Sequence, residues 1–149
     1  MSSPFRKVVN KQLGELLVEN KIITRVQLEE TVKIQKERKG ILLGELLVEL
    51  GFAKEEDIAN ALAAQYGFPY LPLDNYEIDK DLIKLIPKNV SKQFCLVPVD
   101  KLGSSLVVAM SNPLNTQAIE DVEYATGCDV RVFISTSSSI RKKIEESYI

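Results

Sequence analysis

The heptapeptide Leu13-Gly14-Glu15-Leu16-Leu17-Val18-Glu19 occurs a second time, letter for letter, as Leu43-Gly44-Glu45-Leu46-Leu47-Val48-Glu49. The offset is 30 residues, from position 13 to position 43, and the same register continues downstream. There it aligns Leu28 with Ile58, Val32 with Leu62, and Gln35 with Gln65. Such a repeat is usually one supersecondary unit that cannot bury its apolar face alone. Because two copies are too few for a solenoid, we expect a duplicated helix pair that closes on itself.

In each copy the apolar residues recur at helical spacing, which predicts two helices per copy. We expect the first helix of each copy to be short, ending near Asn20-Lys21 in copy one and at Gly51 in copy two. The second helix of copy one begins at a capping box, with Thr24 at the N-cap and Gln27 three residues later.

The second helix of copy two is predicted from about Glu55 to Tyr66. Its acidic first turn complements the positive end of the helix dipole, and Gly67 ends it. Residues 11–68 are therefore predicted to form a four-helix subdomain from a duplicated helix pair.

Residues 69–149 have a different pattern, which predicts an α/β subdomain with a small mixed β-sheet packed with helices. Short helices are expected at 79–85 and 88–94, after an extended segment set by prolines. The order after them is strand, strand, helix, strand, helix: Leu96–Val99, Leu106–Met110, Thr116–Ala125, Asp129–Ile134 and Ser137–Tyr148. Pro98 favours an edge position for the first strand, and the wholly apolar second strand is expected at the centre. The fold class is α+β.

The helix predicted at 116–125 has Ala118, Ile119 and Val122 on its inner face, together with Tyr124 or Ala125. The Asn112-Pro113 break follows the central strand, where α/β proteins bind ligands. We interpret it as a turn.

Composition excludes several classes of function. The chain has 149 residues, 45% hydrophobic and 27% charged, and this is ordinary globular composition. Its net charge of −2 argues against binding to a nucleic acid polymer. It contains no histidine, and its two cysteines, Cys95 and Cys128, are read as reduced core thiols, so we expect no metal site. No phosphate-binding loop motif is present, and we expect a non-catalytic protein.

The N-terminal segment lacks the apolar core of a signal peptide. No apolar run approaches the roughly 18 residues of a membrane span. These features predict a cytoplasmic protein.

Two pairs of repeated residues have alternative interpretations. Gln35 and Gln65 are read first as boundary amides, and alternatively as a symmetric pair of amides that contact a ligand. Glycine in a helix costs roughly 0.5–1 kcal/mol of stability relative to alanine. Its presence at both Gly14 and Gly44 therefore indicates that a neighbouring group approaches the backbone closely there. That neighbour is either another helix or a ligand at the helix N-terminus.

The duplicated L-G-x-x-L-[LV] unit is followed by L-V-P-V, L-V-V-A-M-S-N-P-L and A-I-E-D-V-E-Y-A-T-G. This combination resembles the N-terminal (MshEN/GspE N-terminal) domain of type II secretion and type IV pilus assembly ATPases, over about residues 10–149. The resemblance implies a regulatory and docking module that binds a protein of the inner-membrane platform. The ATPase motor domain is implied as a partner in cis or in trans, and contact with the membrane only through partners.

In one branch of this family the paired repeat binds cyclic di-GMP. Its repeat reads R-L-G-x-x-[LVI]-[LVI]-x-x-G-[LVI]-[LVI], then four residues, then L-x-x-x-[LVI]-x-x-Q. This pattern falls on Gln12 to Gln35 and on Leu42 to Gln65, so glutamine and leucine replace the leading arginines, and Lys21 replaces a glycine. Arg6, Lys7 or Lys11 is a candidate to supply the missing charge. The resemblance implies these candidate nucleotide-binding residues: Arg6, Gln12, Leu13, Gly14, Leu17, Leu28, Gln35, Leu43, Gly44, Leu47, Ile58, Leu62 and Gln65.

Three classes of function are therefore weighed. The first is a docking module of a secretion or pilus motor, and the second is a cyclic di-GMP receptor. The third is an enzyme, for which Asp121 and Glu123 beside Tyr124 form the one acidic cluster near a conceivable cleft. Such a cluster is usually a solvated helix face.

Overall fold

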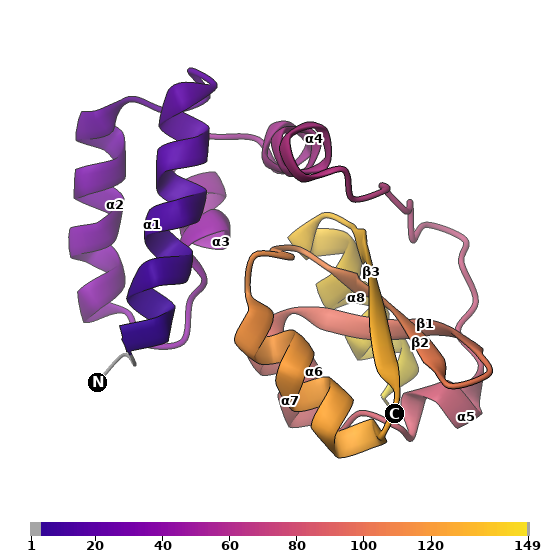
Figure 1. The fold of residues 1–149 in the computed structure, drawn as a ribbon. Helices are drawn as coiled ribbons and strands as arrows, with labels where there is room; N and C mark the ends of the chain where they lie inside the picture. Colours follow the sequence, from indigo (N-terminus) through magenta and orange to yellow (C-terminus); the bar gives the residue numbers. More distant parts are fainter. Residues whose placement is uncertain (1–3, 149) are drawn as a thin grey trace.

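The computed structural model describes the backbone of residues 4–148 and the side chains of residues 12–148. Figure 1 shows the chain from its helical N-terminal part to a small sheet flanked by helices. The elements are α1 (Pro4–Glu19), α2 (Arg25–Glu37), α3 (Leu43–Glu49), α4 (Glu55–Tyr66), α5 (Lys80–Ile83), α6 (Lys88–Phe94), β1 (Leu96–Leu102), β2 (Ser105–Met110), α7 (Thr116–Thr126), β3 (Asp129–Ile134) and α8 (Ser137–Ser147).

The first helices of the two copies differ in length, although they end alike. Helix α1 has 16 residues and begins at Pro4, so the expectation of a short first helix is wrong for copy one. Proline is favoured in the first turn because its missing N–H has no intrahelical acceptor there. Helix α3 has seven residues, as expected for copy two.

Both first helices end in the same turn. Ile22 N–H donates to the Leu17 carbonyl at 3.0 Å, and Phe52 N–H donates to the Leu47 carbonyl at 3.0 Å. The residue in the left-handed conformation is Lys21 in copy one, with φ 59°, and Gly51 in copy two, with φ 79°. The turn is therefore the same in both copies, although only copy two has the glycine that suits it.

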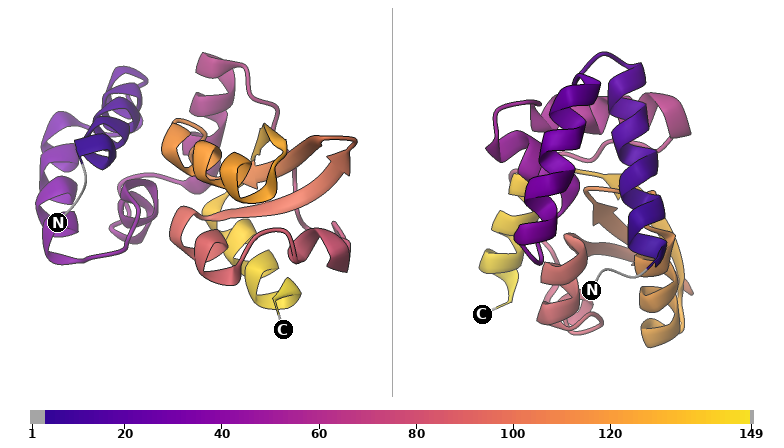
Figure 2. Two further views of the ribbon diagram at one scale, coloured as in Figure 1. Left: turned by 60° about the horizontal axis from the view of Figure 1, so that its bottom comes forward. Right: turned by 90° about the vertical axis from the view of Figure 1, so that its left-hand side faces the viewer.

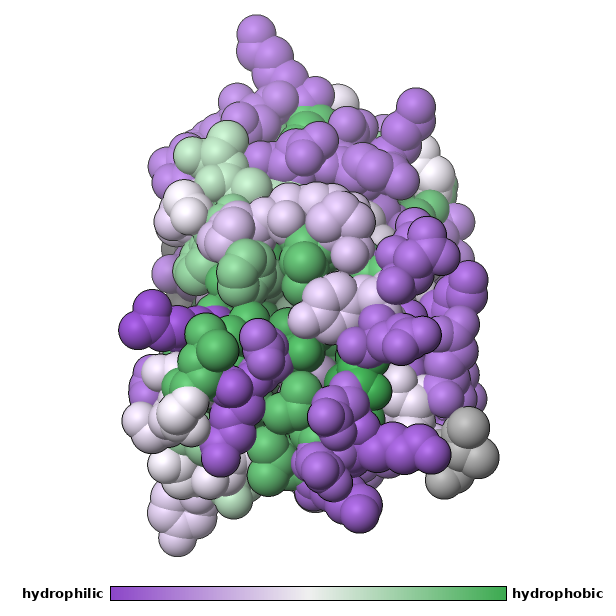
Figure 3. Space-filling model, turned by 90° about the vertical axis from the view of Figure 1, so that its right-hand side faces the viewer, coloured by the Kyte–Doolittle hydropathy of each residue, from purple (hydrophilic) through white to green (hydrophobic). Residues whose placement is uncertain are grey.

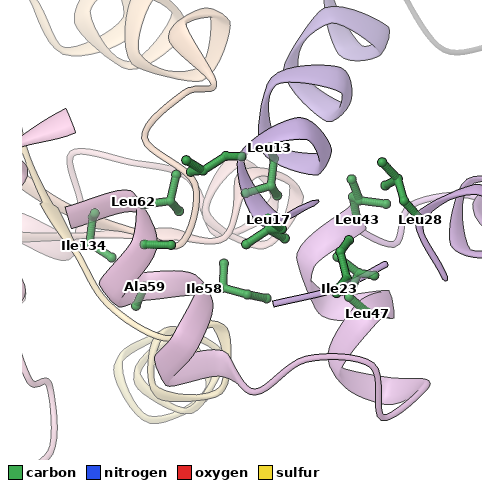
Figure 4. Packing of buried hydrophobic residues seen from close by; sticks show 12 residues of the cluster. Leu13, Leu17, Ile23, Leu28, Leu43, Leu47, Ile58, Ala59, Leu62 and Ile134 are labelled. Atoms are coloured by element: carbon green, nitrogen blue, oxygen red, sulfur yellow. The ribbon is translucent and has the colours of Figure 1, made fainter. Parts of the chain in front are cut away.

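The four repeat helices share one core, which confirms the predicted arrangement of four helices in two pairs. Figure 4 shows leucines of α1 and α3 pointing toward the buried residues of α2 and α4. Ile134 of β3 closes this core from the sheet side. The predicted capping box of α2 is present, with Gln27 N–H donating to Thr24 Oγ1 at 3.1 Å and Thr24 N–H to Gln27 Oε1 at 2.9 Å.

The sheet has the order β1-β2-β3, with β1 antiparallel and β3 parallel to β2. The predicted element order and the central position of β2 are confirmed. Strand β1 continues to Leu102, beyond the predicted end at Val99, across an irregularity between Pro98 and Asp100. The turn between the first two strands is therefore shorter than predicted.

Helices cover both faces of the sheet. Alternate residues of β1 and β2 pack on one side against Ile140 and Ile144 of α8, and on the other side against Ala118 and Val122 of α7. The expected inner position of Tyr124 or Ala125 is wrong, because both are exposed and Tyr124 has 94% of its surface accessible. Only a narrow stripe of side chains on α7 therefore packs against the sheet.

An extended segment joins the two halves, as its prolines predict. Ile134 N–H donates to the Pro69 carbonyl at 2.8 Å, and Leu71 N–H donates to the Ile134 carbonyl at 2.8 Å, so this segment pairs with the end of β3. Tyr76 Oη donates to the Val99 carbonyl at 3.0 Å. Figure 3 shows hydrophobic side chains gathered at the centre of this side of the molecule, between hydrophilic ones.

Candidate functional site: the cleft between the repeat and the sheet

A cleft of about 800 Å³ lies where the second repeat copy meets the sheet half. Its walls come from the beginnings of α3 and α4, the end of α6, the beginning of α7, and the segments that follow β2 and β3. Figure 2 shows the repeat helices on one side of the molecule and the sheet on the other. The volume is within the range of small-molecule sites.

The strand ends explain why polar groups gather in the cleft. Because β2 and β3 are parallel, their carboxyl ends lie at the same edge of the sheet, where α/β folds commonly bind ligands. Several of these groups also serve the local backbone. Asn112 Oδ1 accepts from Leu114 N–H at 3.1 Å, and Asn115 Oδ1 accepts from Ala118 N–H at 3.2 Å. The Asn112-Pro113 break thus forms the predicted turn, and Asn112 also lines the cleft.

The charge of the cleft is predominantly acidic. Glu45, Glu55 and Asp121 line it, and Lys92 is the one basic residue among its described walls. Arg141 on α8 neutralises Glu45, with Nε at 3.1 Å from Oε2 and Nη2 at 2.8 Å from Oε1. This hydrogen bonding raises the pKa of the Arg141 guanidinium, so the guanidinium stays charged. The Arg141 guanidinium is therefore already engaged by a residue of the cleft wall.

Four candidate residues from the repeat line the cleft: Leu13, Leu43, Gly44 and Ile58. Four others are packed in the repeat core, with at most 9% of their surface exposed: Leu17, Leu28, Leu47 and Leu62. The side chain of Arg6, like those of Lys7 and Lys11, lies outside the described residues. Nucleotide binding by these candidates stays a prediction.

The repeated glutamines have different environments. Gln35 is buried, with 8% of its surface exposed, and its Nε2 donates to the Ile41 carbonyl at 3.0 Å in the connection between α2 and α3. Gln65 is exposed near the end of α4, and Gln12 is exposed on α1. The structure does not place Gln35 and Gln65 as a symmetric pair.

The repeated glycines also differ. A Cβ at Gly14 would lie 2.7 Å from Leu28 Cδ1, so Gly14 permits close packing of α2 on α1. Gly44 has its nearest neighbours, Leu13 and Ile58, at 3.8 and 3.9 Å from such a Cβ. Contact between helices explains Gly14, whereas Gly44 is part of the cleft wall.

The acidic cluster on α7 has local structural roles. Glu123 Oε2 accepts from Val130 N–H at 3.0 Å, and Gln117 Nε2 donates to Asp121 Oδ1 at 3.3 Å. Within the described residues, no three histidine, cysteine, aspartate or glutamate side chains are grouped so that they would hold a metal ion. Cys95 and Cys128 are buried free thiols. None of the described helices is long and apolar enough to cross a membrane.

Sequence reasoning missed the residues that join the two halves, chiefly Glu45, Glu55 and Arg141. Glu45 and Arg141 are 96 positions apart, and nothing in the local sequence pairs them. One signal was available. Arg25 of copy one is aligned with Glu55 of copy two, so the two copies have opposite charges at this equivalent position.

Comparison with known proteins gives the same family as the sequence motifs. The MshEN domain family matches residues 66–149. The type IV pilus assembly ATPase PilB of Myxococcus xanthus is 36% identical over 92% of this chain, and the chain spans 24% of that relative.

Two solved structures also resemble this chain along nearly its full length. The N-terminal domain of XpsE has a TM-score of 0.71 and 25% identity, covering 97% of each chain. MshE with cyclic di-GMP (cdg) has a TM-score of 0.67 and 29% identity, covering 91% of this chain and 98% of that one. This chain corresponds to the N-terminal domain of such ATPases and not to their catalytic domain, and it belongs to the MshEN domain family.

Proposed function

We propose that this chain is a non-catalytic regulatory and docking domain of a secretion or pilus assembly ATPase, and that it binds a protein of the inner-membrane platform. The observation that supports docking is that α2 is the outermost helix of the repeat half (Figure 1). Of the residues of α2, only Leu28, Thr31 and Gln35 are buried. The domain would act in the cytoplasm and reach the membrane through partners.

The outer face of α2 has the composition of a specific protein contact. Val26 is an apolar residue with 63% of its surface exposed. Exposed charges of both signs follow it along the helix, including Glu29, Glu30 and Lys33. A mixed pattern of charges favours selection of one partner over general adhesion, and an exposed apolar residue supplies contact area.

Titration of this chain against the cytoplasmic part of a platform protein tests the proposal, with binding expected at micromolar concentration. Val26→Lys should weaken binding at least tenfold, because it replaces the exposed apolar residue of this surface with a charge. Tyr124→Lys on α7 is the control, because Tyr124 is also an exposed large side chain but lies on the other half. Equal affinities for both variants and the parent would remove α2 as the docking surface, and failure to bind any platform protein would reject the proposal.

A second candidate function is binding of cyclic di-GMP. It is favoured by the solved structure of MshE with that ligand and by a cleft that includes Leu13, Leu43 and Gly44. The acidic walls and the replacement of both leading arginines oppose it. Loss of one charge-assisted contact costs about 1.5–3 kcal/mol, or roughly ten- to hundredfold in affinity.

Isothermal titration at low salt tests this second function. Restoring both arginines, as Gln12→Arg with Leu42→Arg, should tighten binding at least tenfold relative to the parent. Lys33→Arg on the exposed face of α2 is a control that adds a guanidinium away from the cleft. Absence of heat with both the parent and the restored variant would show that the repeat serves as a scaffold only.

A further inference from the structure

The duplicated glutamate of the heptapeptide has a different partner in each copy. In copy one, Glu15 pairs with Arg25 of the next helix, at 3.0 Å from Nη1 and 2.9 Å from Nη2. The equivalent residues of copy two are Glu45 and Glu55, so the partner inside the copy has become a second carboxylate. Glu45 therefore has no cation at that position of its own copy.

Glu45 instead binds a cation from the other half of the molecule. Arg141 of α8 contacts both oxygens of Glu45, and its Nη1 also donates to the Lys92 carbonyl at the end of α6. The side chains are 21% exposed for Glu45 and 31% exposed for Arg141, whereas those of Glu15 and Arg25 are 38% and 55% exposed. A bidentate pair that is partly withdrawn from water is stronger and more directional than an exposed one.

Glu55 also binds α8. Its carboxylate accepts from Ser138 N–H at 2.8 Å and from Ser138 Oγ at 2.5 Å. Ser138 is in the first turn of α8, where backbone N–H groups have no acceptor within the helix. A carboxylate of the repeat half thus caps a helix of the sheet half.

We propose that Glu45–Arg141 and Glu55–Ser138 form one latch that holds the second repeat copy against α8, and that the reversal of charge from Arg25 to Glu55 created it. Ser138 and Arg141 are three positions apart, so they lie on the same side of α8. The two contacts therefore oppose both separation and rotation of the halves. Glu45 and Glu55 also line the cleft, so the latch holds two of its wall residues in place. This inference is independent of the proposed function.

Hydrogen exchange at the Ser138 amide tests whether the two contacts act together. Arg141→Gln removes the partner of Glu45 but leaves Glu55 and Ser138 in place. If the contacts are one latch, exchange at Ser138 should be about tenfold faster, because loss of a charge-assisted bidentate contact increases local opening. Amides of the buried strand β2, such as Val108, should be unchanged. Arg25→Gln, which breaks only the pair in copy one, should leave Ser138 unchanged.

Two results would overturn the latch. Unchanged exchange at Ser138 in Arg141→Gln would mean that the Glu55 contact is independent. Faster exchange at every amide would mean that Arg141 stabilises the fold as a whole.

A second variant keeps the proposal testable if Arg141→Gln does not fold. Glu55→Arg gives Glu45 the partner that Glu15 has in copy one, and also removes the Ser138 cap. The distance between spin labels at positions 33 on α2 and 120 on α7, both exposed, should change from one narrow distribution to a broad one. The reverse change in copy one, Arg25→Glu, should keep it narrow, and a narrow distribution in Glu55→Arg would refute the proposal.

Discussion

Gly14 packs beneath Leu28 so closely that a Cβ at position 14 would lie 2.7 Å from Leu28 Cδ1 and 2.9 Å from Leu28 Cδ2. The same letter of the same heptapeptide at Gly44 has no neighbour of that kind nearer than 3.8 Å. Identical heptapeptides have thus acquired different packing, because Gly14 faces Leu28 whereas Gly44 faces Leu13 and Ile58. Substitutions at equivalent positions of the two copies can therefore separate the effect of local sequence on stability from the effect of tertiary packing.

Alanine at the two glycines should therefore act in opposite directions. Gly14→Ala should lower the free energy of unfolding by about 1–3 kcal/mol, because Leu28 must move or α2 must separate from α1. Gly44→Ala should raise it by about 0.5–1 kcal/mol, because alanine reduces the entropy of the unfolded chain. Denaturant unfolding measures both, and equal effects would contradict this account of the packing.

The residues that end the first helices offer a second comparison. Lys21 has φ 59° and Gly51 has φ 79°, a conformation that costs a side chain energy but suits glycine. Lys21→Gly should stabilise the protein by roughly 0.5–1 kcal/mol, and Gly51→Lys should destabilise it by a similar amount. Thermal unfolding of both variants tests the prediction, which fails if Lys21→Gly lowers the melting temperature.

The N-caps of α2 and α4 also differ. Thr24 accepts a hydrogen bond from Gln27 N–H, whereas its equivalent, Lys54, makes no side-chain cap. Thr24→Ala should cost about 1 kcal/mol, and Lys54→Thr should add a few tenths to about 1 kcal/mol. Lys54→Ala is the control for loss of the lysine alone. A neutral Thr24→Ala, measured by denaturant unfolding, would mean that tertiary packing holds α2 without its cap.

Alkaline pH should destabilise the protein through Cys95. Burial raises the pKa of its thiol from 9.0 to about 11, since the charged form is poorly solvated there. The folded state thus holds this proton more tightly than the unfolded state. The resulting stability is fully present below pH 9 and is lost as the pH rises towards 11, by roughly 2–3 kcal/mol. Cys95→Ala should flatten this part of the pH profile of unfolding, and an equally steep profile in the variant would assign the loss to other groups.

The periodic and capping signals predicted most of the fold. Apolar runs and prolines predicted three strands with β2 central, although β1 continues past its predicted end at Val99 to Leu102. Gly67 and Gly127 end α4 and α7 in the left-handed conformation, as predicted. The extent of α1 was missed, although Ser3 followed by Pro4 is a sequence signal for the start of a helix. Tyr124 was misplaced because it lies two residues after the buried Val122, about 200° around the helix from it.

The candidate site was less predictable, because its groups come from distant parts of the chain. Gln35 and Gln65 occupy equivalent positions of the two repeat copies, which suggested equivalent roles. Gln35, however, donates to Ile41 in a connection that leads directly into α3, and the chain after Gln65 turns away towards the sheet. Sequence spacing likewise gives no indication that Glu45 and Arg141 meet. The repeat shows which positions are equivalent, and only tertiary structure shows which neighbours they acquire.

The pairing of Pro69 and Leu71 with Ile134 limits how the repeat helices can move. Only Gly67 and Phe68 separate the end of α4 from that tie, a tether of about 7 Å when extended. The helices therefore cannot drift away from the sheet and can only pivot about this short tether. Helix α2 lies farthest from the pivot and is about 20 Å long (Figure 1). A rotation at the tether would therefore displace the outermost surface of the domain more than any other part of the repeat half.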